Sequence, residues 1–299
     1  MKGTDVLRSR RIIALILSVF VASTIFGAEK SPRTIHLLFT NDLLGGIAAI
    51  PARFMNPEYP PMLSGGAGAH NYVQEVRERA KARGEAVLLL DGGNFFSGTI
   101  LGTYDRGRTM IRWMNWMGYD AAAVGPFDFD YGWQNVRQLT QQAEFPFLSG
   151  NISRDDSGEP VSFVKPYILK TFNGTTVGIV GITAANVRNQ TMPSNVEGLD
   201  FQPPLPVVQS LVDEVREKGA DVVIVLSSLG LPYDRREEYD TLLDKVEAGK
   251  KHWERLPLNT LELAHFVDGV DLIATRANTA GYRTPWEDPK THTLVIQNY

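Results

Sequence analysis

Short apolar runs alternate with helical patterns along nearly the whole chain, and this alternation limits the folds that the sequence can adopt. Runs that are typical of buried β-strands lie at residues 35–40, 86–90, 177–182 and 221–226, with shorter ones at 121–124, 271–274 and 293–297. Helical patterns lie between them, at residues 68–83, 109–117, 132–139 and 207–218. Three of these patterns stop next to a glycine, as helices commonly do. The alternation predicts an α/β fold with a largely parallel or mixed sheet.

Two segments interrupt this alternation. Residues 51–63 contain four prolines, which predicts a surface loop. Residues 233–263 have a helical pattern with charges of both signs, which is typical of a solvated helical excursion.

The first 28 residues have the pattern of a secretory signal. Arg8, Arg10 and Arg11 precede an apolar run at residues 12–26, and small residues follow it. The run is shorter than the roughly 20 residues that a membrane-spanning helix needs, which favours a signal peptide over an uncleaved anchor. We therefore expect a periplasmic or extracellular protein, with residues 29–299 as its folded domain. Contact with a membrane is expected only through residues 1–28, if they stay attached.

Composition excludes several classes of function. The formal net charge is −4 at pH 7, which argues against binding of a nucleic acid polymer. The chain has no cysteine, so thiolate zinc sites and cysteine nucleophiles are excluded. The sequence also has neither a Gly-x-Ser-x-Gly elbow nor a phosphate-binding loop followed by Lys and Ser or Thr.

Five polar motifs follow the predicted strands in a fixed order. They are Thr-Asn-Asp at 40–42, Leu-Asp-Gly-Gly-Asn at 90–94, Gly-Pro-Phe-Asp-Phe-Asp-Tyr-Gly at 125–132, Ser-Ser-Leu-Gly at 227–230 and Arg-Ala-Asn-Thr at 276–279. In order and spacing they resemble motifs of the 5′-nucleotidase branch of the calcineurin-like metallophosphatases, over about residues 34–299. This resemblance implies an α/β metallophosphatase-type sandwich of four layers, with helices flanking a central pair of mixed β-sheets. It also implies that a C-terminal nucleotide-specificity domain, present in full-length members, is absent here.

The resembled family holds two divalent metal ions about 4 Å apart, which activate water against a phosphate ester. Asp42 keeps its carboxylate at the first ligand position. At the family's other ligand or active-site positions, the expected imidazole, carboxylate or amide is replaced in Leu44, Asn94, Pro126, Phe127, Ser228 and Ala277. One carboxylate with weak neutral oxygens does not replace the three or more ligands that each ion usually needs. The resemblance therefore implies no metal ligands, no metal cofactor and no catalytic residue in this chain.

Four polar side chains at these positions are candidate ligand-binding residues. They are Asp42, Asn94, Asp128 and Ser228. The carboxyl ends of strands in an α/β sheet are where such folds bind ligands, so these side chains could line a polar pocket. The alternative is that they satisfy backbone groups of turns, as Asp and Asn commonly do. If the side chain of Arg276 turns inward, it adds a fixed positive charge at the same place.

These observations favour an exported, catalytically inactive relative of metallophosphatases, which acts as a binding or scaffold module. Its partner would be a small polar ligand or another protein. One alternative is a phosphoester or nucleotide hydrolase with a remodelled site around Asp42, Asn94 and Asp128. The other is a truncated fragment without a function.

Overall fold

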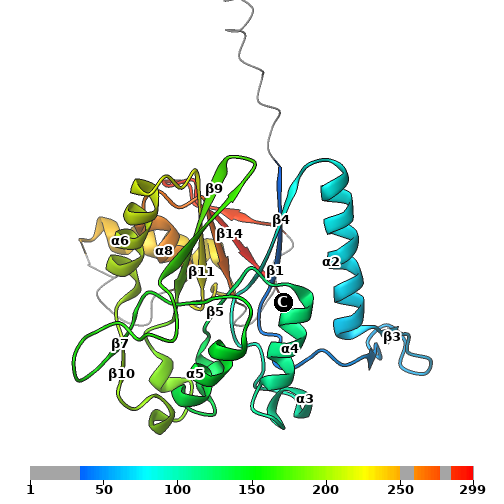
Figure 1. Ribbon diagram of the computed structural model, residues 1–299. Helices are drawn as coiled ribbons and strands as arrows, with labels where there is room; N and C mark the ends of the chain where they lie inside the picture. Colours follow the sequence, from blue (N-terminus) through cyan, green and yellow to red (C-terminus); the bar gives the residue numbers. More distant parts are fainter. Residues whose placement is uncertain (1–33, 250–258, 277–283, 299) are drawn as a thin grey trace, which may run out of the picture. The chain divides into compact units, whose positions relative to one another are not determined.

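The computed structural model describes residues 34–249, 259–276 and 284–298. The chain divides into two compact units, Met1–Thr34 and Ile35–Tyr299. The predicted signal segment, residues 1–28, lies outside the described residues, and the helices and strands of Figure 1 belong to the second unit. Within the described ranges, no helix has both the length and the apolar character needed to cross a membrane.

Two β-sheets form the centre of this unit (Figure 1). The first sheet has four parallel strands, in the order β1 (Ile35–Thr40), β4 (Ala86–Asp91), β5 (Ala121–Ala123) and β6 (Phe147–Leu148). The second has six, in the order β13 (Trp286–Glu287), β14 (Leu294–Gln297), β12 (Leu272–Thr275), β11 (Val222–Ser227), β9 (Thr175–Ile182) and β8 (Tyr167–Phe172). Its outer strands β13 and β8 are antiparallel to their neighbours, and the inner strands are parallel. The predicted central pair of sheets is confirmed: the second sheet is mixed as expected, and the first is parallel throughout.

Helices cover the outer face of each sheet. Those on the first sheet are α2 (Gly65–Ala82), α4 (Arg108–Met117) and α5 (Trp133–Gln142). Those on the second are α6 (Pro204–Glu217), α7 (Arg235–Glu247) and α8 (Thr260–Phe266). Because successive side chains of a strand point to opposite faces, Leu89 of β4 packs under the helices while Leu88 and Leu90 face the other sheet. Helix, sheet, sheet and helix therefore form the four predicted layers.

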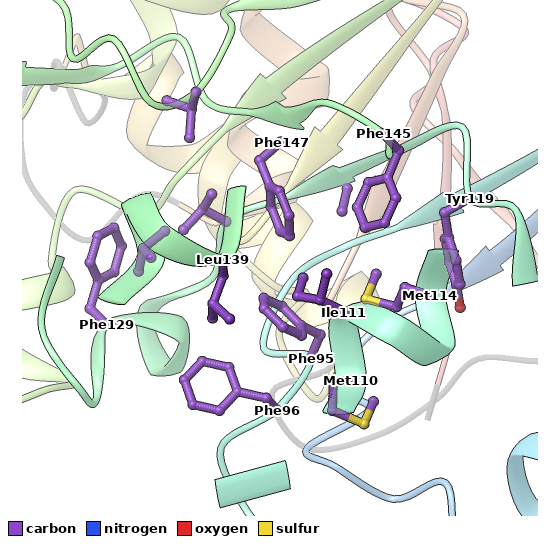
Figure 2. Close-up of a cluster of buried hydrophobic side chains, with 14 of the residues drawn as sticks. Phe95, Phe96, Met110, Ile111, Met114, Tyr119, Phe129, Leu139, Phe145 and Phe147 are labelled. Carbon is purple, nitrogen blue, oxygen red and sulfur yellow. The ribbon is translucent and has the colours of Figure 1, made fainter. Parts of the chain in front are cut away.

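The core between the first sheet and its helices is rich in aromatic and methionine side chains. Figure 2 shows Phe95, Phe147, Ile111 and Met114 in one cluster of buried side chains, and the rings of Phe95 and Phe147 lie 5.5 Å apart. Met110, Met114 and Met117, which share one face of α4, are all buried. This packing holds the loop after β4, which carries Asn94, firmly against the sheet.

Small residues allow the two sheets to approach closely. A Cβ added to Gly181 of β9 would collide with the main chain of Leu148 on β6 at 2.4 Å, whereas one added to Gly178 would lie 3.0 Å from Val215 Cγ2 and 3.2 Å from Ala220 Cβ. We expect Gly181→Ala to lower the free energy of unfolding by about 2 kcal/mol, because overpacking against backbone cannot relax. Gly178→Ala should cost clearly less, because its neighbours need to move by only a few tenths of an ångström. Urea denaturation of both variants measures these changes. An equal loss of unfolding free energy in the two variants would contradict the close approach of the two sheets at Gly181.

The predictions for the two segments that interrupt the alternation agree with the structure to different extents. Residues 51–63 lie at the surface as predicted, although their ends pair as β2 (Ile50–Pro51) and β3 (Met62–Leu63). The helical prediction for residues 233–263 is confirmed by α7 and by the start of α8, while residues 250–258 lie outside the described part. The predicted solvated character is wrong for the face that carries Tyr239 and Leu242, which are buried in the second core.

Several elements were not predicted. The strand β8 pairs with β9 through a turn at Asn173 and Gly174, a dipeptide that is a strong hairpin signal. The others are short: β7 (Ile152–Arg154), β10 (Leu199–Phe201), β13, α3 (Ile100–Thr103), and the 3₁₀ turns η1 (Pro126–Phe129), η2 (Val187–Asn189) and η3 (Pro193–Val196). Strands of two or three residues carry too few side chains for a period to be recognised.

Candidate functional site

The polar motifs of the sequence meet at one edge of the paired sheets. Asp42 follows β1, Asn94 follows β4, Asp128 follows β5, Ser228 follows β11 and Arg276 follows β12. The carboxyl ends of parallel strands meet at the same edge, which is the usual ligand-binding edge of an α/β fold. The structure therefore brings together all four predicted residues, with Arg276 as a fifth.

The Asn94 side chain links the segment after β1 to the segment after β5. Its Nδ2 donates a hydrogen bond to Asp42 Oδ1 at 2.7 Å, and its Oδ1 accepts one from the Phe127 backbone N–H at 2.9 Å. Asn94 is fully buried and has φ of 60°, a left-handed conformation that Asn tolerates better than most residues. Both polar atoms of its amide are thus committed to neighbours within the chain.

The buried side chain of Asp128 joins the loop after β4 to the loop after β5. Its carboxylate accepts hydrogen bonds from the backbone N–H groups of Asn94, Phe95 and Gly125 at 2.8–2.9 Å. The side chain is fully buried. Burial raises the pKa of Asp128 to about 7, although the three backbone donors oppose this rise. The geometry is that of a carboxylate that satisfies backbone groups of turns, which is the alternative to ligand binding.

A second buried carboxylate, Asp91, lies at the end of β4. It accepts hydrogen bonds from Thr40 Oγ1 at 2.6 Å and from the Gly93 backbone N–H at 2.8 Å. Burial raises the pKa of Asp91 to about 8, because the two hydrogen bonds offset only part of the effect of burial. Thr40 Oγ1 also contacts the Tyr119 hydroxyl at 2.8 Å, which extends this polar cluster into the core.

The side chain of Arg276 turns inward and is 5% exposed. Its Nε donates to the Ser228 carbonyl oxygen at 2.8 Å, and its Nη2 donates to Gln190 Oε1 at 2.7 Å. Nη1 lies 3.9 Å from Asp42 Oδ1, and the guanidinium lies 5.7 Å from the centre of the Phe127 ring. Burial lowers the pKa of Arg276, while the charge of Asp42 opposes that change. A protein cation therefore lies next to the Asp42 carboxylate.

Ser228 takes part through its backbone as well as its hydroxyl. The hydroxyl accepts a hydrogen bond from the Ala184 backbone N–H at 2.8 Å, and the residue is fully buried. Of the four predicted residues, Asn94, Asp128 and Ser228 are thus enclosed, and Asp42 alone keeps a partly exposed side chain.

Sequence reasoning missed Gln190, which lies just after η2 and orients the guanidinium. No motif marks it, because the contact joins residues 86 positions apart in the chain. Asn41, whose Nδ2 donates to Asp42 Oδ2 at 2.9 Å, was visible as part of the Thr-Asn-Asp motif.

These residues do not fit a pair of divalent metal ions. Asn94 already uses both amide atoms, Ser228 Oγ accepts from the backbone, and the Arg276 guanidinium repels a second cation beside Asp42. In the ranges that the structure describes, no group of three or more His, Asp or Glu side chains could hold a metal ion. The four described histidines have separate contacts, namely His36 with Glu85, His70 with Trp116, His265 with Tyr239 and His292 with Glu287.

Two relatives match most of the chain. The UshA protein of Escherichia coli K12 is 27% identical over 276 residues, which cover 90% of this chain and 47% of that protein. A 5′-nucleotidase of Vibrio cholerae is 25% identical over 229 residues, which cover 73% of this chain and 39% of that protein. The chain thus spans less than half the length of either relative. No family model matches it.

Solved structures share the same fold. SoxB, a sulfate thiohydrolase of Thermus thermophilus, superposes with a TM-score of 0.69 at 21% identity, covering 91% of this chain and 52% of its own. The calcineurin-like phosphoesterase YfkN of Bacillus subtilis gives a TM-score of 0.66 at 20% identity, covering 89% of this chain and 81% of its own. The resemblance seen in the motifs is confirmed: the chain is similar in sequence to UshA and to a 5′-nucleotidase, and it shares the fold of the calcineurin-like phosphoesterase YfkN.

Proposed function

We propose that this chain is an exported relative of the 5′-nucleotidases that binds no catalytic metal ions and acts as a binding or scaffold module. Residues 1–28 are its export signal and residues 29–299 its metallophosphatase-like domain. Its partner is another protein or a small polar ligand, held without hydrolysis.

The observation that carries this proposal is the position of the Arg276 guanidinium. It lies 3.9 Å from Asp42 and hydrogen-bonds to the Ser228 carbonyl and to Gln190. In a buried environment, a fixed positive charge neutralises a carboxylate as a metal ion does, but it offers no open coordination position for water. The surviving framework is thus held together without the metal-bound water that hydrolysis in this family needs.

The proposal is tested by measuring bound metal and turnover together. The full chain is incubated with Mn²⁺ or Zn²⁺, freed of unbound metal, and assayed with 5′-AMP and p-nitrophenyl phosphate. We expect far less than one metal ion per chain and no turnover above that of the Asp42→Ala variant. Turnover that is lost in Asp42→Ala would instead establish a hydrolase with a remodelled site.

A further inference from the structure

A separate pocket lies between the start of helix α7 and the edge strand β13. Its volume is about 590 Å³, within the usual range for sites that bind small molecules. Tyr233, Tyr239, Trp286 and Pro289 supply its aromatic and apolar lining. It shares no lining residue with the Asp42–Arg276 cluster, so what it binds does not depend on the fate of the metal site.

The wall of the pocket is fixed by contacts behind it. The Tyr239 hydroxyl lies 3.1 Å from His265 Nδ1, and the Tyr239 and Trp286 rings pack edge to face with centroids 5.1 Å apart. Asp288, between Trp286 and Pro289, is fully buried and accepts hydrogen bonds from the Lys290 and Thr291 backbone N–H groups. A pocket formed in advance binds with a smaller entropic cost than one that must be ordered by its ligand.

The same turn is anchored to the second core. Thr291 Oγ1 donates to the Ala264 carbonyl oxygen at 2.8 Å, and Lys290 Nζ donates to the His265 carbonyl oxygen at 3.0 Å. The aromatic wall is therefore tied to α8 as well as to β14, with which Trp286 pairs.

The polar lining has one available donor group and one available acceptor group. The Arg236 guanidinium and the Asp240 carboxylate have no hydrogen-bond or ion-pair partner among the described residues, and both residues are exposed. Asp234 instead accepts from the Arg236 and Glu237 backbone N–H groups, so its carboxylate is used to cap α7. Arg236 and Asp240 lie four positions apart on α7 and therefore on one face of the helix, so the guanidinium can donate to one hydroxyl group of a ligand and the carboxylate can accept from another.

The charge of the pocket narrows the class of ligand. Two arginines and two aspartates line it, so neither an anion nor a cation gains a net attraction. A quaternary ammonium group would suit the aromatic rings but would meet Arg235 and Arg236. A neutral ligand with hydroxyl groups and an apolar ring face matches both the aromatic and the polar lining.

We propose that this pocket binds a neutral saccharide, with its ring against Trp286 and its hydroxyl groups on Arg236 and Asp240. Aromatic side chains would cover the apolar C–H face of the sugar ring. The two charged side chains would fix its orientation through hydrogen bonds.

Saturation-transfer NMR on the full chain tests the assignment, with glucose, galactose, N-acetylglucosamine and maltose as separate probes. We expect saturation transfer to at least one of these sugars. Arg236→Ala and Asp240→Ala should each weaken its affinity by about tenfold, the usual effect of losing a charge-assisted hydrogen bond. Glu238→Ala, at an exposed position of the same helix outside the pocket, is the matched control and should leave the affinity unchanged.

Three results would overturn the proposal. One is that none of the four sugars binds. Another is that a sugar binds equally well to the Arg236→Ala and Asp240→Ala variants while both remain folded by circular dichroism. The third is that tetramethylammonium or inorganic phosphate, tested in parallel, binds in place of the sugars and loses affinity in the same variants.

Discussion

Replacing Arg276 with methionine is expected to lower the free energy of unfolding by about 3 kcal/mol. The guanidinium is almost fully buried, and its loss leaves the Ser228 carbonyl and the Gln190 side chain without their donor. It also removes the positive charge beside Asp42. Removing one partner of a buried polar network costs more than the network contributes, because the remaining groups stay desolvated. Urea denaturation followed by circular dichroism measures the change.

A matched control separates this network from a general effect of losing an arginine. Arg79 is 55% exposed and pairs with Glu75 on the surface of α2, so Arg79→Met should change stability by less than about 0.5 kcal/mol. Combining Arg276→Met with Asp42→Asn should cost less than the sum of the single changes, because the carboxylate left without a cation is then neutral. Equal effects of Arg276→Met and Arg79→Met would show that the guanidinium does not hold the site together.

Stability is expected to fall as the pH rises from about 4 to about 8, and Asp91 is the main cause. Burial raises the pKa of this carboxyl from 3.8 to about 8 in the folded chain. Between those values the folded chain keeps a proton that the unfolded chain has released, so each rise in pH favours unfolding. The full effect is on the order of 5 kcal/mol. Asp128, whose pKa burial raises to about 7, adds a change of the same sign at lower pH.

The variant Asp91→Asn tests this assignment, since the amide cannot titrate and can still accept from the Gly93 backbone N–H. Its free energy of unfolding should depend much less on pH than that of the unchanged chain. Asp268→Asn, at an exposed position, should keep the original dependence. Parallel pH profiles for the unchanged chain and for Asp91→Asn would contradict a protonated Asp91 in the fold.

The long apolar strands and the helices that end next to glycine could be predicted because each is a local pattern of side chains. The resemblance carried by the motifs then implied the layers, which the cores around Leu88 and Leu89 confirm. The order of the strands depends on contacts between distant segments, and no local pattern encodes these. The strand β8 is a different case, since the Asn173-Gly174 turn was a readable signal.

The residues that form the site could be predicted from the sequence, but the contacts between them could not. The motif order placed Asp42, Asn94 and Ser228 at one edge of the sheets, because parallel strands end together. Whether Arg276 turned inward depended on Gln190, whose amide reaches the guanidinium from a loop 86 positions away. The saccharide pocket likewise joins α7 to β13 across 46 positions or more, from Asp240 to Trp286, so neither segment marks it alone.

Anomalous scattering from crystals soaked in Mn²⁺ tests most directly whether the guanidinium of Arg276 has taken over the role of the metal ions. We predict no anomalous peak beside Asp42, and electron density that places the Arg276 side chain between the Ser228 carbonyl and Gln190. A manganese peak within bonding distance of an Asp42 oxygen, with Arg276 displaced from Ser228, would contradict the proposed loss of the metal site.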